Sequence, residues 1–195
     1  MARRHHRDPR PGDEEFIPLA DAERREHADA LRARAHDDPY ERAQILAEAA
    51  EYYAMLGDHL QAEQLFKQAL ADGGAQAGSV HGYYADFLFD QGREPEALEM
   101  IRQARRQRPV APDVFNAIGE TLLEHDHPAD AAKWFTTGLV RALGDLAEIE
   151  LDDLHDDPDI AMLTRGRHEA RQTMDLTPDH LDELFERYRT QTHHP

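Results

Sequence analysis

A pattern of glycine, alanine and large apolar residues recurs three times between residues 43 and 145. Its members are Gly57, Ala62, Phe66 and Ala69, then Gly92, Ala97, Ile101 and Ala104, then Ala131, Phe135 and Gly138. Gly57 and Gly92 are 35 residues apart, and Ala97 and Ala131 are 34 apart. Periods of this length indicate an array of similar supersecondary units, each of which buries its apolar face only against its neighbours.

Each copy of the pattern predicts two helices joined by a turn. Apolar residues such as Leu46, Ala50 and Tyr53 are spaced by three and four residues, as on an amphipathic helix. Gly57 then ends the first helix, because glycine is typical of helix C-termini. In the third copy Asp126 replaces this glycine, and since aspartate tolerates the left-handed conformation, we expect the turn to be kept. Small residues would let two helices approach, and large ones would fill the space between pairs.

These positions resemble those of the tetratricopeptide repeat family over about half of the chain. The resemblance implies an all-α fold, a TPR-like α-solenoid in which helix-turn-helix repeats form a right-handed superhelix with capping helices at both ends. At the family's aromatic fourth position the three copies have Leu46, His81 and Phe115, so only the third matches there. The C-terminal part and the Arg-, Ala- and Asp-rich composition resemble those of actinobacterial tetratricopeptide repeat proteins.

The capping and proline signals divide the chain into five segments. Residues 1–16 are expected to be a disordered tail. The other segments are an N-terminal capping helix at 17–37, three repeats within 38–146 (about 43–76, 78–111 and 112–145), C-terminal capping helices at 147–190, and a tail at 191–195. Asp38-Pro39 resembles a helix start, with an N-cap aspartate followed by proline at the first helical position. Asp157-Pro158 and Thr177-Pro178 predict two further helix starts.

The resemblance also implies a groove, lined by the first helix of each pair, that holds a peptide. The residues at the groove positions are mostly acidic, with two aromatic residues near the middle. They include Glu48, Glu51, Met55, Tyr83, Asp86, Phe89, Asp90, Asn116, Glu120 and Glu124. Family grooves that hold a C-terminal carboxylate use Lys, Arg and Asn, and only Asn116 matches that set. An acidic groove with aromatic residues instead favours Arg or Lys side chains, through ion pairs and cation–π contacts.

Composition excludes several classes of protein. The 195 residues have a formal net charge of −18 and include no cysteine. The negative charge argues against general nucleic-acid binding, because phosphate backbones are bound by clustered Lys and Arg. The lack of cysteine excludes disulfides and thiol catalysis. No apolar run reaches the ~18 to 20 residues of a membrane span, and no signal-type apolar segment follows the basic start, so we expect a cytoplasmic protein.

Other candidate chemistry is weak. His125-Asp126-His127 could begin a metal site, but residues two apart in a turn rarely converge with two further ligands. Ser79 and His81 do not face each other on a helix, and no acid completes a catalytic triad. The pairs His5-His6 and His193-His194 are features of the tails. We expect no catalytic residue, no cofactor and no metal site.

Two groups of arginines remain, and each could pair with the acidic run from Glu148 to Asp159 or contact an acidic partner. They are Arg102, Arg105 and Arg106, and Arg165, Arg167 and Arg171. Charge runs of this kind usually form solvated helix faces.

The predicted function is that of a non-catalytic adaptor or regulatory module. It would bind a basic or amphipathic segment of a partner protein, and neither nucleic acid nor a membrane. The alternative is a homodimer formed through repeat surfaces, in which a second copy covers apolar residues such as Phe89 or Trp134. A third possibility is a regulatory piece that acts with an enzyme.

Overall fold

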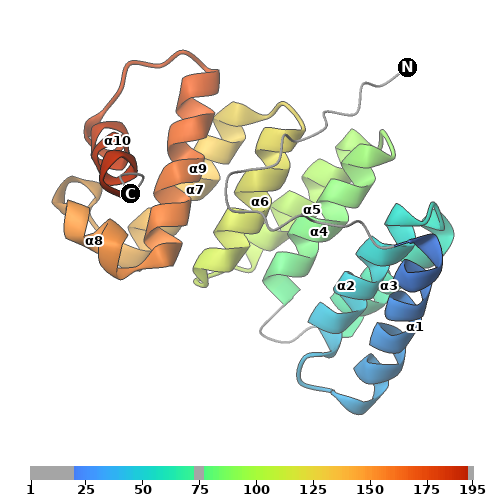
Figure 1. Cartoon of the computed structure of the whole chain (residues 1–195). Coiled ribbons are helices and arrows are strands. Elements are labelled where there is room, and N and C mark those ends of the chain that lie inside the picture. The colour runs from blue at the N-terminus through green and yellow to red at the C-terminus, as the bar shows by residue number, and fades with distance from the viewer. Residues whose placement is uncertain (1–19, 73–76, 193–195) are drawn as a thin grey trace.

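The computed structural model describes residues 20–72 and 77–192, and every regular element in these ranges is a helix (Figure 1). The helices are α1 (Asp21–Asp37), α2 (Arg42–Met55), α3 (His59–Asp72), α4 (Ala77–Asp90), α5 (Glu94–Arg106), α6 (Pro112–Glu124), α7 (Pro128–Leu143), the 3₁₀ turn η1 (Leu146–Glu148), α8 (Leu151–Asp156), α9 (Pro158–Thr173) and α10 (His180–Thr192). The N-terminal tail, Gly73-Gly74 and residues 193–195 lie outside the described residues. Gln191 and Thr192, predicted to be part of the tail, belong to α10.

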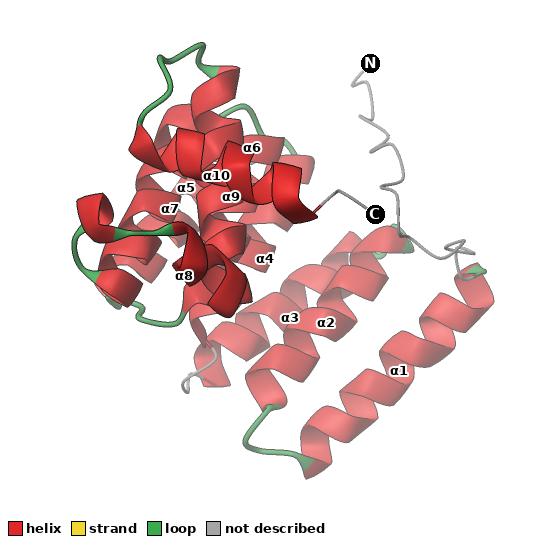
Figure 2. Cartoon of the chain, turned by 60° about the vertical axis from the view of Figure 1, so that its left-hand side comes forward, coloured by secondary structure: helices red, strands yellow, loops and turns green. Residues whose placement is uncertain are grey.

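The helices pack as consecutive pairs. The pairs are α2 with α3, α4 with α5, and α6 with α7. The first helices of the pairs also pack on one another, α2 on α4 and α4 on α6, and α9 then packs on both α6 and α7. Figures 1 and 2 show the pairs stacked in chain order, with α1 at one end and α8, α9 and α10 at the other. This arrangement confirms the predicted all-α, TPR-like solenoid with capping helices.

The turns within the three pairs have the same backbone geometry. Gly57, Gly92 and Asp126 have φ values of 76°, 71° and 62°, in the left-handed region. The amide that follows each of them bonds back to the first helix, for example Arg93 N to Leu88 O at 2.8 Å and His127 N to Leu122 O at 2.8 Å. These bonds satisfy carbonyls at the helix end. The prediction for Asp126 is therefore confirmed.

Close approach of helices depends on glycine beside the Phe135 ring. A Cβ atom at Gly119 of α6 or at Gly166 of α9 would lie 2.4 Å from Cζ of Phe135. Phe135 is fully buried on α7. Its ring therefore fills a space that exists only because neither neighbouring helix has a side chain there.

At the N-terminal end, α1 buries Ala28, Leu31 and Ala35 against the first pair. The predicted helix start at Asp38 is wrong, because α2 begins at Arg42. The Asp38 carboxylate accepts hydrogen bonds from the amides of Tyr40 and Glu41, at 3.2 and 3.1 Å. It therefore stabilises the turn between α1 and α2.

At the C-terminal end, an ion-pair network joins α9 to α10 and to the segment before it. Arg167 bonds to both carboxylate oxygens of Asp179, at 3.1 and 2.6 Å. Asp182 is 3% exposed and accepts from Arg171 Nε at 2.8 Å. Pairing with the acidic run at 148–159 was one of the possibilities for these arginines, and Arg167 and Arg171 instead pair with carboxylates in and just before α10.

The homodimer alternative took Trp134 as apolar surface that a second copy could cover, but it is 2% exposed. Its ring lies 5.6 Å from that of Phe115, and the guanidinium of Arg105 lies 5.4 Å from its ring centre. Trp134 is therefore a core residue and offers no surface to a second copy. Arg102 and Arg106 pair with Glu99 on their own helix, at 2.8 and 3.1 Å.

None of the described helices is long and apolar enough to span a membrane.

Candidate functional site

We use the term inner face for the exposed sides of α2, α4, α6 and α9, the helices that pack in one row. All ten residues predicted to line a groove are partly or fully exposed side chains of the first three of these helices. Carboxylates on this face include Glu48, Glu51, Asp86, Asp90, Asp113, Glu120, Glu124 and Asp159. Because α2, α4 and α6 are adjacent, these groups form one acidic surface.

Tyr83 lies near the middle of the inner face, on α4. Its phenol has a raised pKa because it is partly buried and faces the carboxylates of Glu51, Asp113 and Glu120, while a hydrogen bond with Gln44 acts in the opposite direction. The ring therefore lies in a region of negative potential. An aromatic ring in such a region can attract a cation through its face as well as through its acidic neighbours.

Glu51 lies on α2 and faces α4. Burial, followed by the charges of Asp86 and Glu48, raises the pKa of Glu51 from 4.5 to about 7. It makes no ion pair with any residue in the described ranges. A carboxylate crowded by other carboxylates in this way would be stabilised by a cation from outside the chain.

Asp86 and Phe89 on α4 contact the turn after α6. Asp86 Oδ1 lies 2.7 Å from His125 Nε2, and the His125 ring stacks on Phe89 at a centroid distance of 4.6 Å. Burial lowers the pKa of His125, but Asp86, Asp90 and Glu124 raise it more, so the net shift is upward. Phe89 is thus held between helices and is only partly exposed, rather than being a free aromatic anchor.

Two other predicted groove residues lie beside basic side chains of the capping helices. Glu120 Oε1 lies 3.0 Å from Arg165 Nη2 of α9. Glu48 lies 3.9 Å from His27 Nε2 of α1. Arg165 of α9 therefore neutralises Glu120 at one end of the acidic surface, whereas Glu51, Asp113 and Asp159 make no ion pair with a described residue.

The remaining predicted residues lie along the same face. Met55 is 65% exposed at the end of α2. Asp90 and Glu124 are exposed at the ends of α4 and α6, where both contribute to the field at His125. Asn116 is partly buried, and its Oδ1 atom has no hydrogen-bond partner in the described structure.

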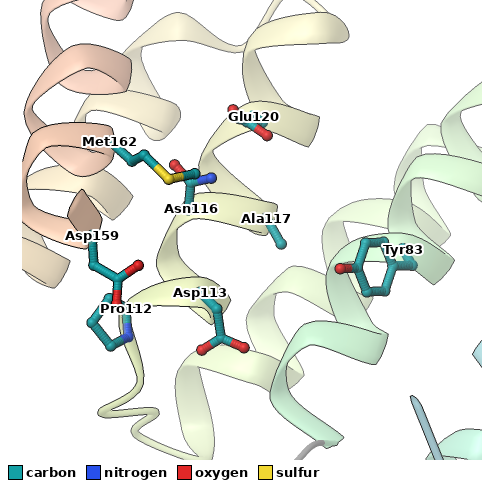
Figure 3. Close-up of a pocket in the computed structure, with 8 residues that line it drawn as sticks. All are labelled: Tyr83, Pro112, Asp113, Asn116, Ala117, Glu120, Asp159 and Met162. Atoms are coloured by element: carbon teal, nitrogen blue, oxygen red, sulfur yellow. The ribbon is translucent and has the colours of Figure 1, made fainter. Parts of the chain in front are cut away.

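A pocket of about 200 Å³ lies between α4, α6 and α9 (Figure 3). It is lined by Tyr83, Pro112, Asp113, Asn116, Ala117, Glu120, Asp159 and Met162. In Figure 3 the Tyr83 hydroxyl points towards α6, and Asp113 and Asp159 lie at the Pro112 end. The pocket thus includes three of the predicted groove residues, Tyr83, Asn116 and Glu120.

Sequence reasoning missed the contribution of α9 to this surface. Asp159 and Met162 line the pocket, and Met162 is 40% exposed. The cap at Asp157, which accepts from the Asp159 amide at 2.9 Å, was visible in the sequence. The packing of α9 on α6 was not, because α8 and η1 interrupt the period before it.

The predicted absence of metal and catalytic clusters remains a prediction, but two arrangements bear on it. The two histidines contact different carboxylates. His125 Nε2 lies 2.7 Å from Asp86 Oδ1, and His127 Nε2 lies 3.5 Å from Glu94 Oε1. Within the described ranges, no three His, Asp or Glu side chains form a group that could hold a metal ion. Ser79 and His81 are both buried, at 3% exposure each.

Comparison with known proteins gives one match. A family model described as "Tetratricopeptide repeat" matches residues 53–121, from the last turn of α2 to α6. No curated protein and no solved structure matches the chain. The matched repeats generally mediate protein–protein interaction and are in general not catalytic, and the match does not bear on an actinobacterial origin. Residues 53–121 are therefore similar to tetratricopeptide repeats, in agreement with the stacked helix pairs.

Proposed function

We propose that the chain is a non-catalytic adaptor or regulatory protein that binds a basic or amphipathic segment of a partner protein on its inner face. The main support is the set of carboxylates around Tyr83 that have no cation of their own. Glu51, Asp113 and Asp159 make no ion pair with described residues, although they come from three different helices. A partner with Arg or Lys would supply the missing charge.

Opposite charge would act mainly on the association rate and the choice of partner. Exposed ion pairs contribute little free energy each, whereas a negative surface attracts a basic segment from a distance. The partly exposed apolar residues Met55, Tyr83 and Met162 would supply contact area for the apolar side of an amphipathic segment.

The test is a titration with a fluorescein-labelled amphipathic peptide of arginine and leucine, monitored by fluorescence polarisation. The comparison peptide has glutamate in place of every arginine. We expect binding of the arginine peptide only, with an affinity that falls as salt increases, because the surface charges are screened.

A triple variant locates the binding surface. Glu51→Gln, Asp86→Asn and Glu120→Gln together should weaken binding about tenfold, since each rim charge contributes a few tenths to one kcal/mol. The matched control, Glu96→Gln, Glu99→Gln and Asp130→Asn, removes the same charge from α5 and α7. Equal weakening by both variants, or equal binding of both peptides, would contradict the proposal.

A further inference from the structure

The pocket between α4, α6 and α9 has a negative charge that the chain does not neutralise. Glu120 pairs with Arg165, but Asp113 and Asp159 make no ion pair with a described residue. Both aspartates lie in the first turns of their helices, α6 and α9. The pocket therefore presents two charged acceptors to whatever enters it.

The size of the pocket limits its occupant. Its volume of about 200 Å³ is below the ~300 to 1,000 Å³ of pockets that hold small molecules. It would hold one long side chain. Tyr83, Ala117 and Met162 provide apolar walls along which methylene groups can lie, and Asp113 and Asp159 lie together at the Pro112 end (Figure 3).

The unpaired side-chain oxygen of Asn116 indicates that the occupant of the pocket carries a hydrogen-bond donor. The Asn116 Oδ1 atom is buried and has no hydrogen-bond partner in the described structure. A buried acceptor without a partner costs free energy, which a donor from a bound group would recover once the Asn116 side chain turns towards it. This observation is independent of the charge on the aspartates.

We propose that this pocket takes one arginine side chain of the partner segment. The proposal rests on the proposed function, because it specifies what the inner face recognises. The guanidinium group has five donors in a plane and can bond to carboxylates and an amide oxygen at the same time. It also stacks on aromatic rings, and Tyr83 provides one. A lysine ammonium is a point charge that is more strongly hydrated, so it gains less in a pocket with a planar wall.

The first test observes the pocket directly. Met162 is one of five methionines, so its ¹³C-labelled methyl signal can be assigned by a Met162→Leu variant. Adding the arginine–leucine peptide should shift the Met162 signal, while Met100, on the outer helix α5, should not move. A peptide with citrulline in place of arginine keeps the shape without the charge and should leave Met162 unchanged.

The second test uses variants and a series of peptides in which each arginine in turn is replaced by lysine. The pocket variant is Asp113→Asn with Asp159→Asn, and the control is Asp152→Asn with Asp156→Asn on the exposed side of α8. Replacing one particular arginine of the peptide by lysine should lower the affinity for the wild-type protein about tenfold. The pocket variant should bind the arginine and lysine peptides with equal affinity. The control should keep the difference between them.

The two tests give different results if the arginine pocket is wrong and if the proposed function is wrong. If the wild-type protein binds no arginine peptide, the proposed function itself fails. If it binds but Met162 does not shift, or if lysine and arginine are equivalent at every position, the function stands and the arginine pocket is wrong.

Discussion

At the scale of single residues, Phe135 shows how little space the helices leave one another. Its ring lies where a Cβ of Gly119 or Gly166 would be, so the third pair and α9 can pack closely only with glycine at both positions.

Gly166→Ala should therefore destabilise the fold by about 1 to 3 kcal/mol, the usual cost of overpacking a core. Urea denaturation would measure this as a lower midpoint. Gly82→Ala is the control, because its Cβ would lie 3.3 Å from Ile118 Cγ1 rather than 2.4 Å from a ring. Phe135→Leu in the Gly166→Ala background should recover part of the loss. A Gly166→Ala protein as stable as wild type would contradict this packing.

Glu51 makes stability depend on pH. Its pKa is about 7 in the folded chain against 4.5 as the ordinary value, so the folded state keeps its proton to higher pH. Relative to the folded state at high pH, the folded state is therefore more stable below pH 4.5, and this stability is lost as the pH rises from 4.5 to 7, because ionised Glu51 is unfavourable in the folded chain.

Glu51→Gln should accordingly raise the free energy of unfolding at pH 8 by about 1 to 3 kcal/mol and have little effect near pH 4.5. The upper bound follows from the shift in the pKa of Glu51, at about 1.36 kcal/mol per pKa unit. Denaturation midpoints at the two pH values test this. Glu26→Gln, on the exposed side of α1, removes the same charge without a buried site and should show no such difference. Equal effects of Glu51→Gln at both pH values would show that Glu51 is not crowded by its neighbours.

At the scale of helices, the sequence predicted those features that depend on local rules. The turns at Gly57, Gly92 and Asp126 follow from which residues accept a positive φ, and the start of α9 follows from Asp157-Pro158. Asp38 was misassigned because its carboxylate satisfies two amides in a turn instead of a helix start, and the two roles have the same sequence pattern.

The packing of α10 on α9 could not be predicted from the sequence, because buried ion pairs join these two helices and the repeat period does not extend to them. Asp182 on α10 contacts Arg167, Arg171 and His168 of α9 while almost fully buried. Nothing in the spacing of these residues distinguishes that network from a solvated charged face.

Asp182→Ala should cost about 3 kcal/mol, because it leaves the buried Arg167 without one of its partners. Thermal or urea denaturation would measure the loss, and circular dichroism would show whether α9 and α10 remain helical. Glu99→Ala, which breaks exposed pairs with Arg102 and Arg106, should leave stability unchanged within error. A small effect of Asp182→Ala would mean that apolar contacts alone hold α10.

At the scale of the whole molecule, part of the negative charge is gathered on the inner face. The net charge of −18 was evident in the sequence, and the repeat register placed Glu51, Asp86 and Glu120 on adjacent helices. Two features of the inner face depend on contacts across the stack and could not be predicted. One is the internal pairing of Asp86 with His125 and of Glu120 with Arg165, and the other is the wall that α9 adds to the pocket.

The central claim is that the inner face is where a basic segment binds. Backbone ¹H–¹⁵N chemical-shift mapping with the arginine–leucine peptide tests it most directly, because it reports on every helix in one experiment. We predict shifts concentrated on α2, α4, α6 and the first half of α9, around Tyr83. Shifts on α3, α5 and α7 instead, or none with saturating peptide, would contradict the claim.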